Sequence, residues 1–259
     1  MSKPYSIANV LLAGLFISAN PTFAQSDNEH PDLSGNWNNG SGIDFVQPKI
    51  IGASICVAAC DEAPPTAAAV AHPPPDRPKY KPEFAAKVRD LNERQVEEDS
   101  ILRCMSPGVP RIGPPDMIVQ QTDQIVFLYD DVNGNYFRVV PLDGRGHRTD
   151  IEASALGDAI GYWEGDTLVV ETNNLTDDTW LTDDGSFHTT GLKVTERISR
   201  DGDTLRWEVV AEDPAVLAEP WELRPRIATL TDVEILQAPP CLERDLPLME
   251  NMTHHPNIR

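Results

Sequence analysis

The sequence has few basic residues for its length. Lys and Arg number 21 against 41 Asp and Glu, and the 259-residue chain carries a formal net charge of -20 at pH 7. Phosphate backbones and anionic membrane surfaces are bound by clustered Lys and Arg, so a charge of this sign repels both. We therefore expect no nucleic-acid partner, and we expect a bias against anionic substrates.

Long hydrophobic runs are missing beyond the N-terminus. An apolar segment, 7–17, follows Lys3, and the small-residue motif TFA (22–24) precedes Gln25. The segment is too short to span a bilayer, which takes ~20 apolar residues. It is typical of a signal peptide over 1–24, cleaved after Ala24; an uncleaved anchor is the alternative. We expect a periplasmic or secreted protein without membrane insertion.

Sequence motifs for common cofactors and nucleophiles are absent as well. The chain has no G-x-S-x-G elbow, no Walker lysine motif and no G-x-G-x-x-G that opens a helix. Serine-hydrolase, NTPase and Rossmann-dehydrogenase functions lose their main support. We expect a protein that uses no cofactor.

Four cysteines are present, Cys56, Cys60, Cys104 and Cys241. An even number in an exported chain favours disulfides, and three pairings are possible. We favour a local Cys56–Cys60 bridge and a long-range Cys104–Cys241 bridge. The alternative, a zinc site, lacks a second matched C-x3-C pair.

The organisation of the chain predicts one mainly β domain over 25–259. Residues 61–81 are rich in proline and alanine and predict an extended surface segment. Residues 82–104 predict a helix, because Phe84, Val88 and Leu91 recur at helical spacing. Its opposite face is charged, so we expect it to lie outside a sheet.

From residue 117 onward the hydrophobic period becomes two, and short turns such as Asn133-Gly134 separate the runs. This predicts an antiparallel meander curled into a barrel or half-barrel, lipocalin-like in general shape, with the one helix packed outside. The expected strands are 117–121, 124–130, 136–140, 159–164, 167–173, 192–200, 204–212, 225–230 and 233–237.

Glu196 is the first candidate for chemistry. Alternation in 192–200 places it on the apolar face, and Trp207 in the next strand shares that face. Desolvation would favour a general acid or base there, because burial penalises the charged carboxylate. The alternative is a buried ion pair with Arg138 or Arg145 that only stabilises the fold.

Two further groups of polar residues accompany Glu196. Arg138 shares the apolar face of its strand, and Arg145 and His147 lie in the glycine-rich turn 143–147. The long loop 173–192 adds Trp180, Asp183 and His188. Loops over a rigid barrel often carry sites, but a tight turn and a solvated acidic loop are equally open interpretations. A metal on His147, His188 and an aspartate would lack close ligand spacing, so we expect none.

Several segments carry a recognisable pattern, namely DLSGNW (32–37), CMSPGVPR (104–111), DGRGH (143–147), GYWEGDTLVV (161–170), TWL (179–181) and ER (196–197). The chain resembles a family of exported, mostly uncharacterised bacterial proteins over nearly its whole mature length. That family typically shows D-G-R-x-H-P, G-x-W-E-G-D-T-L-V-V, T-W-L-D, P-H-S and E-R. The matching positions are Asp143, Arg145, His147, Trp163, Glu164, Asp166, Trp180, Asp183, His188, Glu196 and Arg197.

The chain departs from this pattern at two places. Arg148 stands where proline is usual, and Phe187-His188-Thr189 replaces P-H-S. These changes affect the two histidine loops more than the fold. The resemblance implies no particular activity.

Taken together, the residues predict a cofactor-independent acid–base enzyme, of lyase, dehydratase or isomerase type, acting on a small hydrophobic molecule. Glu196 would be the acid or base, His147 or His188 its proton partner, and Arg145 or Arg138 the stabiliser of negative charge. Trp163, Trp180, Trp207, Tyr129 and Asp183 would bind the substrate. The alternatives are a carrier of a hydrophobic molecule and a structural envelope protein.

Overall fold

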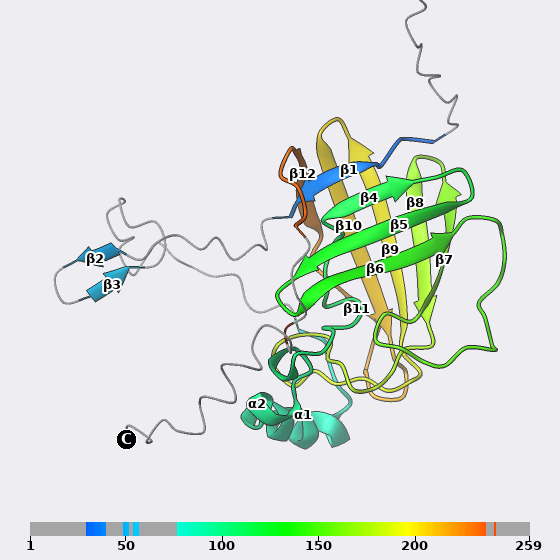
Figure 1. Cartoon of the computed structure of the whole chain (residues 1–259). Helices are drawn as coiled ribbons and strands as arrows, with labels where there is room; N and C mark the ends of the chain where they lie inside the picture. The colour runs from blue at the N-terminus through cyan, green and yellow to red at the C-terminus, as the bar shows by residue number, and fades with distance from the viewer. Residues whose placement is uncertain (1–29, 40–48, 52–53, 57–76, 237–240, 242–259) are drawn as a thin grey trace, which may run out of the picture.

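A computed structural model describes residues 30–39, 49–51, 54–56, 77–236 and 241. Most of these residues form an antiparallel β-barrel that is nearly closed (Figure 1). A small separate hairpin pairs β2 (Lys49–Ile51) with β3 (Ser54–Cys56). Within the described residues, no helix is long and apolar enough to cross a membrane.

Nine strands follow one another around the barrel in the order β6-β5-β4-β1-β12-β10-β9-β8-β7. They comprise β1 (Gly35–Asn38), β4 (Met117–Gln120), β5 (Gln124–Asp131), β6 (Gly134–Pro141), β7 (Asp158–Glu164), β8 (Thr167–Asn173), β9 (Lys193–Asp201), β10 (Thr204–Glu212) and β12 (Arg226–Thr231). Every pairing among them is antiparallel. The predicted meander is confirmed, with β1 inserted between two runs of hairpins.

The barrel closes along the seam between β6 and β7, which end the strand order. Gly161 in β7 lies so close to β6 that a Cβ atom there would come within 2.7 Å of Val140 Cγ1. It would also come within 2.8 Å of Leu142 Cδ2, just beyond β6. A residue without a side chain is therefore what lets these two strands approach.

Inward-facing residues fill the barrel with apolar side chains, among them Trp37, Phe127, Leu168, Ile198 and Leu205. The alternation predicted for β9 and β10 is present, since Val194, Glu196 and Ile198 are buried and Lys193 is exposed. Leu205, Trp207, Val209 and Ala211 are buried on β10.

The predicted helix over 82–104 is broken in the structure. It consists of a 3-10 turn (Pro82–Phe84), α1 (Ala85–Glu93), α2 (Gln95–Glu98) and a second 3-10 turn (Ile101–Arg103). Arg94 interrupts the α-helix with φ −103° and ψ 24°. The apolar face faces inward as expected: Leu91 is buried, and Phe84 and Val88 pack against the core.

These helices cover one end of the barrel, where the loop 173–192 also lies (Figure 1). Phe84 packs edge-on against Phe187 of that loop, with ring centroids 5.9 Å apart. The backbone of Gly185 approaches α1 closely, because a Cβ atom there would lie 2.5 Å from Val88 O. The helix thus fixes the loop over the barrel end.

Three differences from the predicted strands concern the region after β10. A two-residue strand, β11 (Trp221–Glu222), pairs with Val210 and Ala211 of β10, and it was not among the predicted strands. The strand predicted at 225–230 begins and ends one residue later, as β12. No strand forms over 233–236, the described part of the predicted strand 233–237.

A disulfide joins Cys104 to Cys241, as predicted, across 137 residues of sequence. It attaches the segment after the barrel to the helical region, and its presence is compatible with an exported protein. The Cys56–Cys60 bridge involves Cys60, which lies outside the described residues.

Candidate functional site

Glu196 and Arg138 form an ion pair inside the barrel, which we name the interior pair. Glu196 projects from β9 and Arg138 from β6, and Arg138 Nη2 lies 2.7 Å from Glu196 Oε2. Glu196 has 0% of its surface exposed and Arg138 has 4%. Of the two arginines that the sequence proposed as partners for Glu196, the structure selects Arg138.

The other polar groups around the interior pair come from three more strands. Trp207 Nε1 donates to Glu196 Oε1 at 3.0 Å. Arg138 donates to the Tyr129 hydroxyl at 3.1 Å and to Thr172 Oγ1 at 2.7 Å. Tyr129, Trp207 and Thr172 are themselves buried. The cluster therefore ties β5, β6, β8, β9 and β10 together.

Burial and neighbouring charge shift the pKa of two members of this cluster, Arg138 and Tyr129. Burial alone would lower the pKa of Arg138, but the adjacent carboxylate of Glu196 outweighs burial and raises it. Burial raises the pKa of the Tyr129 hydroxyl. Arg138 is therefore held as a guanidinium and Tyr129 as a neutral phenol.

Arg145 and His147 lie away from the interior pair. Arg145 is exposed and binds Asp143 within its own turn, with Nη2 2.5 Å from Asp143 Oδ2. His147 is partly buried and its Nδ1 lies 2.9 Å from Asp158 Oδ2. The turn is thus held by local aspartate contacts, one of the two interpretations open from sequence.

His188 and Trp180 are buried in the loop 173–192. The Nε2 atom of His188 lies 2.9 Å from Thr179 Oγ1, and its Nδ1 lies 3.0 Å from Thr189 O. Burial lowers the pKa of His188, which favours the neutral ring. Trp180 packs in the core cluster and bridges to Phe187.

The remaining predicted residues are scattered. Trp163 is half-buried at the end of β7, where it stacks on His30 with ring centroids 4.6 Å apart. Asp183 is exposed and contacts Arg111. Among the described residues, no three His, Cys, Asp or Glu side chains gather where they could hold a metal ion. The structure therefore brings together Glu196, Arg138, Tyr129 and Trp207 alone.

A hollow of about 450 Å³, which we name the rim pocket, lies beside the loop 173–192, with Leu181, Thr182, Asp183 and Asp184 of that loop in its lining. It forms where the strand partner of β10 changes. β12 pairs with β10 at residues 204–207, and β11 pairs with it at Val210 and Ala211. Leu223 N–H still donates to Val209 O of β10 at 2.9 Å, and the change of partner follows it, at Pro225, which has no N–H for sheet pairing.

The walls of the rim pocket combine apolar and charged side chains. Its apolar members are Pro110, Leu181, Trp221, Leu223 and Pro225. Its other members are Arg77, Arg111, Thr182, Asp183, Asp184, Arg224 and Arg226. Trp221 and Leu181 are buried, so they belong to the fixed part of the wall.

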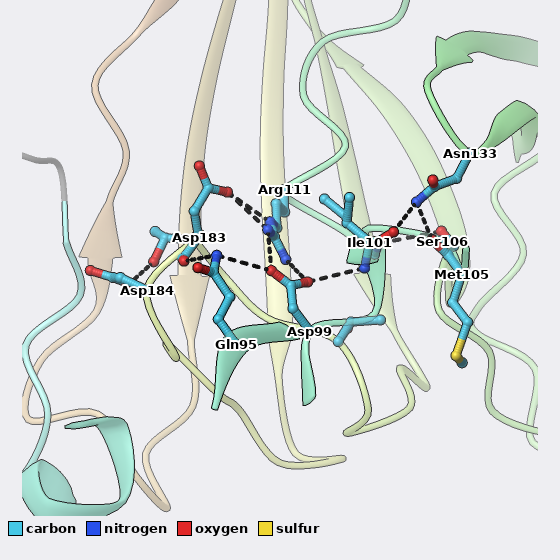
Figure 2. A network of polar contacts seen from close by, with 12 residues as sticks. Gln95, Asp99, Ile101, Met105, Ser106, Arg111, Asn133, Asp183 and Asp184 are labelled. Atoms are coloured by element: carbon cyan, nitrogen blue, oxygen red, sulfur yellow. Dashed lines mark hydrogen bonds and ion pairs between the residues drawn. The ribbon is translucent and has the colours of Figure 1, made fainter. Parts of the chain in front are cut away.

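One wall is held by Arg111, which lies between Asp99 and Asp183 (Figure 2). Arg111 donates to both carboxylate oxygens of Asp99, at 2.7 and 2.8 Å. Burial alone would lower the pKa of Arg111, but the carboxylates of Asp99 and Asp183 together outweigh burial and raise it. Asp99 is 1% exposed and also accepts the Ile101 N–H at 3.0 Å. A bidentate pair of this kind fixes the guanidinium plane.

Gln95 connects the same wall to the loop above it. Its amide donates to Asp183 O at 2.6 Å, and it lies 3.5 Å from Asp99 Oδ2 (Figure 2). Asn133, at the β5–β6 turn, donates to Ile101 O and Met105 O at 2.9 Å each. The pocket wall is therefore connected by hydrogen bonds to the helical region and to a barrel hairpin.

Sequence reasoning named one member of the rim pocket, Asp183, and missed the arginines and Trp221. The run Leu223-Arg224-Pro225-Arg226 carried a signal, because two arginines flanking a proline are unusual in so acidic a chain. The predicted strand 225–230 includes only Pro225 and Arg226 of that run.

No protein-family model matches the chain, and no curated protein matches it either.

Proposed function

We propose that the protein is a carrier that holds a small hydrophobic molecule in the rim pocket without changing it chemically. The observation that carries the proposal is the pocket itself. Its volume of about 450 Å³ lies in the range of small-molecule sites, which is roughly 300–1,000 Å³. Trp221, Leu181 and Leu223 give it the apolar wall that such a ligand needs.

The rigidity of the surrounding elements supports this proposal. The bidentate Arg111–Asp99 pair fixes one wall, and pairing of β11 with β10 fixes the Trp221 side. A wall that is already ordered loses little conformational entropy when a ligand binds. The carrier interpretation therefore needs no rearrangement of the barrel.

An acid–base reaction at Glu196 stays a prediction. Its carboxylate has no exposed surface, and its two oxygens contact Arg138 and Trp207. A substrate would have to displace one of these partners to reach it. That contact pattern favours a structural role for the interior pair and a binding role for the rim pocket.

The test uses a neutral aromatic probe, naphthamide, titrated into the full-length protein by isothermal titration calorimetry. We expect one site, and chromatography should recover the probe unchanged. Leu223→Trp fills the pocket and should abolish binding, and Leu223→Gln places an amide in the apolar wall and should weaken it. Circular dichroism would verify that both variants fold.

A matched control places the same indole elsewhere. Val233 is 70% exposed and lies outside the pocket lining, so Val233→Trp should bind the probe as the wild type does. Conversion of the probe to a product would contradict the carrier. Binding that Leu223→Trp leaves intact would contradict the pocket.

A further inference from the structure

The rim pocket gathers positive charge in a strongly negative chain. Four arginines, Arg77, Arg111, Arg224 and Arg226, line it against two aspartates, Asp183 and Asp184. The chain as a whole carries a net charge of -20. The local charge is therefore opposite in sign to that of the molecule.

Both aspartates of the lining are already engaged. Asp184 forms an ion pair with Arg77, and Asp183 contacts Arg111 at 2.9 Å. Arg111 is further neutralised by Asp99, which lies behind the wall. The charges of Arg77 and Arg111 are thus balanced within the protein.

Arg226 differs from these two. Its guanidinium lies 5.8 Å from the ring centroid of Trp207, and among the described residues no carboxylate forms an ion pair with it. Gly113 lies beside it, so close that a Cβ atom there would be 3.0 Å from Arg226 Nη1. The guanidinium therefore lies near the ring of Trp207 and the backbone of Gly113, and its charge remains available to a ligand.

We infer that the ligand of the rim pocket is an organic carboxylate, with its head group on Arg226 and its apolar body against the Trp221 side. A guanidinium presents a planar fork that matches a carboxylate, and such charge-assisted hydrogen bonds are the strong ones. This inference rests on the proposed carrier function and names the chemical class of its ligand.

The overall charge of the chain is compatible with this inference. At physiological ionic strength the Debye length is about 8 Å, so exposed carboxylates farther away than this are largely screened from the pocket. The sequence-based bias against anionic substrates follows from total charge, whereas binding depends on the charges within a few ångströms. The net charge should slow association more than it weakens binding.

The experiment compares naphthoate with naphthamide, two probes of nearly equal shape that differ in charge, by calorimetry on the full-length protein. We expect wild-type protein to bind naphthoate about tenfold more tightly, which is the effect of one modest charge-assisted contact. Arg226→Met should reduce that preference to less than about twofold, because naphthoate loses its charge-assisted contact and naphthamide has none to lose. Arg226→Lys keeps the charge but loses the planar fork of the guanidinium, so its preference for naphthoate should lie between those of the wild type and Arg226→Met.

The matched control is Arg206→Met. Arg206 is exposed on the neighbouring strand, pairs with Glu208 at 2.7 Å and does not line the pocket. This variant changes the net charge as Arg226→Met does, and it should keep the wild-type preference.

The possible results separate the two proposals. Equal binding of both probes, sensitive to Leu223→Trp, would overturn the carboxylate inference and leave the carrier function standing. A preference that survives Arg226→Met would overturn the role of Arg226. Binding of neither probe would contradict both proposals.

Discussion

At the scale of single residues, the interior pair shows how a barrel accommodates a carboxylate with no exposed surface. Removing an ion from water costs several kcal/mol, and this cost is recovered only where partners and geometry are good. Glu196 has Arg138 and Trp207 as its partners, and Arg138 has Tyr129 and Thr172 in addition. Arg138 Nε has no hydrogen-bond partner among the described residues, so its interactions do not fully offset the cost of removing Arg138 from water.

Glu196→Gln should therefore destabilise the protein strongly. The change leaves Arg138 as a buried, unpaired charge, and losing one member of such a pair typically costs about 3–5 kcal/mol. Denaturant unfolding followed by tryptophan fluorescence would measure the loss. Replacing both partners, in Arg138→Met with Glu196→Leu, should recover much of it because no charge is left unpaired.

Glu208→Gln is the control, because Glu208 forms an exposed pair with Arg206 and should change stability little. A Glu196→Gln variant with wild-type stability but altered turnover of any substrate would favour the acid–base prediction over the structural role.

Asp116 gives a second prediction, on pH dependence. Burial, together with the nearby carboxylates of Asp130 and Asp131, raises the pKa of Asp116 to about 6 from its ordinary 3.8. A raised carboxyl pKa means that the folded protein holds the proton more tightly than the unfolded chain does. The stability it contributes is complete below the unfolded pKa and is lost as pH rises through about 6.

The difference in unfolding free energy between wild type and Asp116→Asn isolates this contribution from other titrating groups. We expect the unfolding free energy of the wild type, relative to that of Asp116→Asn, to increase as pH falls from about 7 to about 4. Urea unfolding at a series of pH values measures it. A pH-independent difference between the two proteins would show that Asp116 titrates normally.

At the scale of secondary-structure elements, the seam between β6 and β7 depends on Gly161. Gly161→Val would place methyl groups where Val140 and Leu142 now lie, and overpacking of this kind costs about 1–3 kcal/mol. Thermal unfolding should show the loss. Gly146→Val is a matched control, because a Cβ at Gly146 would meet nothing within 4 Å. Equal effects of the two substitutions would mean that the seam is not tightly packed.

Strands with clear alternation were predictable, because each half-buried strand imposes a period of two on its own residues. β10 alternates and matches the expected 204–212 throughout; β8 matches the expected 167–173 although Leu168, Val169 and Val170 are all buried. The position of β1 between β4 and β12 was not predictable, since the choice of partner depends on residues far along the chain. β11 has two residues, which is too short to show any period.

The predicted strand at 233–237 illustrates a different limit. Its residues alternate, but β12 already pairs with β1 on one side and β10 on the other. A strand continuing from it would need a free sheet edge nearby. Local pattern cannot reveal that both edges are occupied.

The candidate site was predictable only in its buried part. Inward parity placed Glu196 and Trp207 on one face and left Arg138 or Arg145 as the partner of Glu196; the structure pairs Glu196 with Arg138. The rim pocket is formed by four separate segments of the chain, around Arg77, Arg111, Asp183 and Trp221. No periodic pattern links such segments, so their meeting could not be inferred from sequence.

At the scale of the whole molecule, the Cys104–Cys241 disulfide fixes the end of the described chain to the helical region. In the loop-entropy model a bridge that closes more than a hundred residues stabilises by up to about 5 kcal/mol. The double variant Cys104→Ala with Cys241→Ala should unfold at lower denaturant concentration than the wild type. An unchanged midpoint would mean that the bridge contributes nothing to barrel stability.

We propose that the ligand binds in the rim pocket and not beside the interior pair. A crystal structure of the full-length protein with a brominated naphthoate tests it directly, through the anomalous signal of bromine. We predict a bromine peak in the rim pocket, with the carboxylate within hydrogen-bonding distance of Arg226. A peak inside the barrel next to Glu196 would contradict binding in the rim pocket and would make the interior pair the candidate functional site.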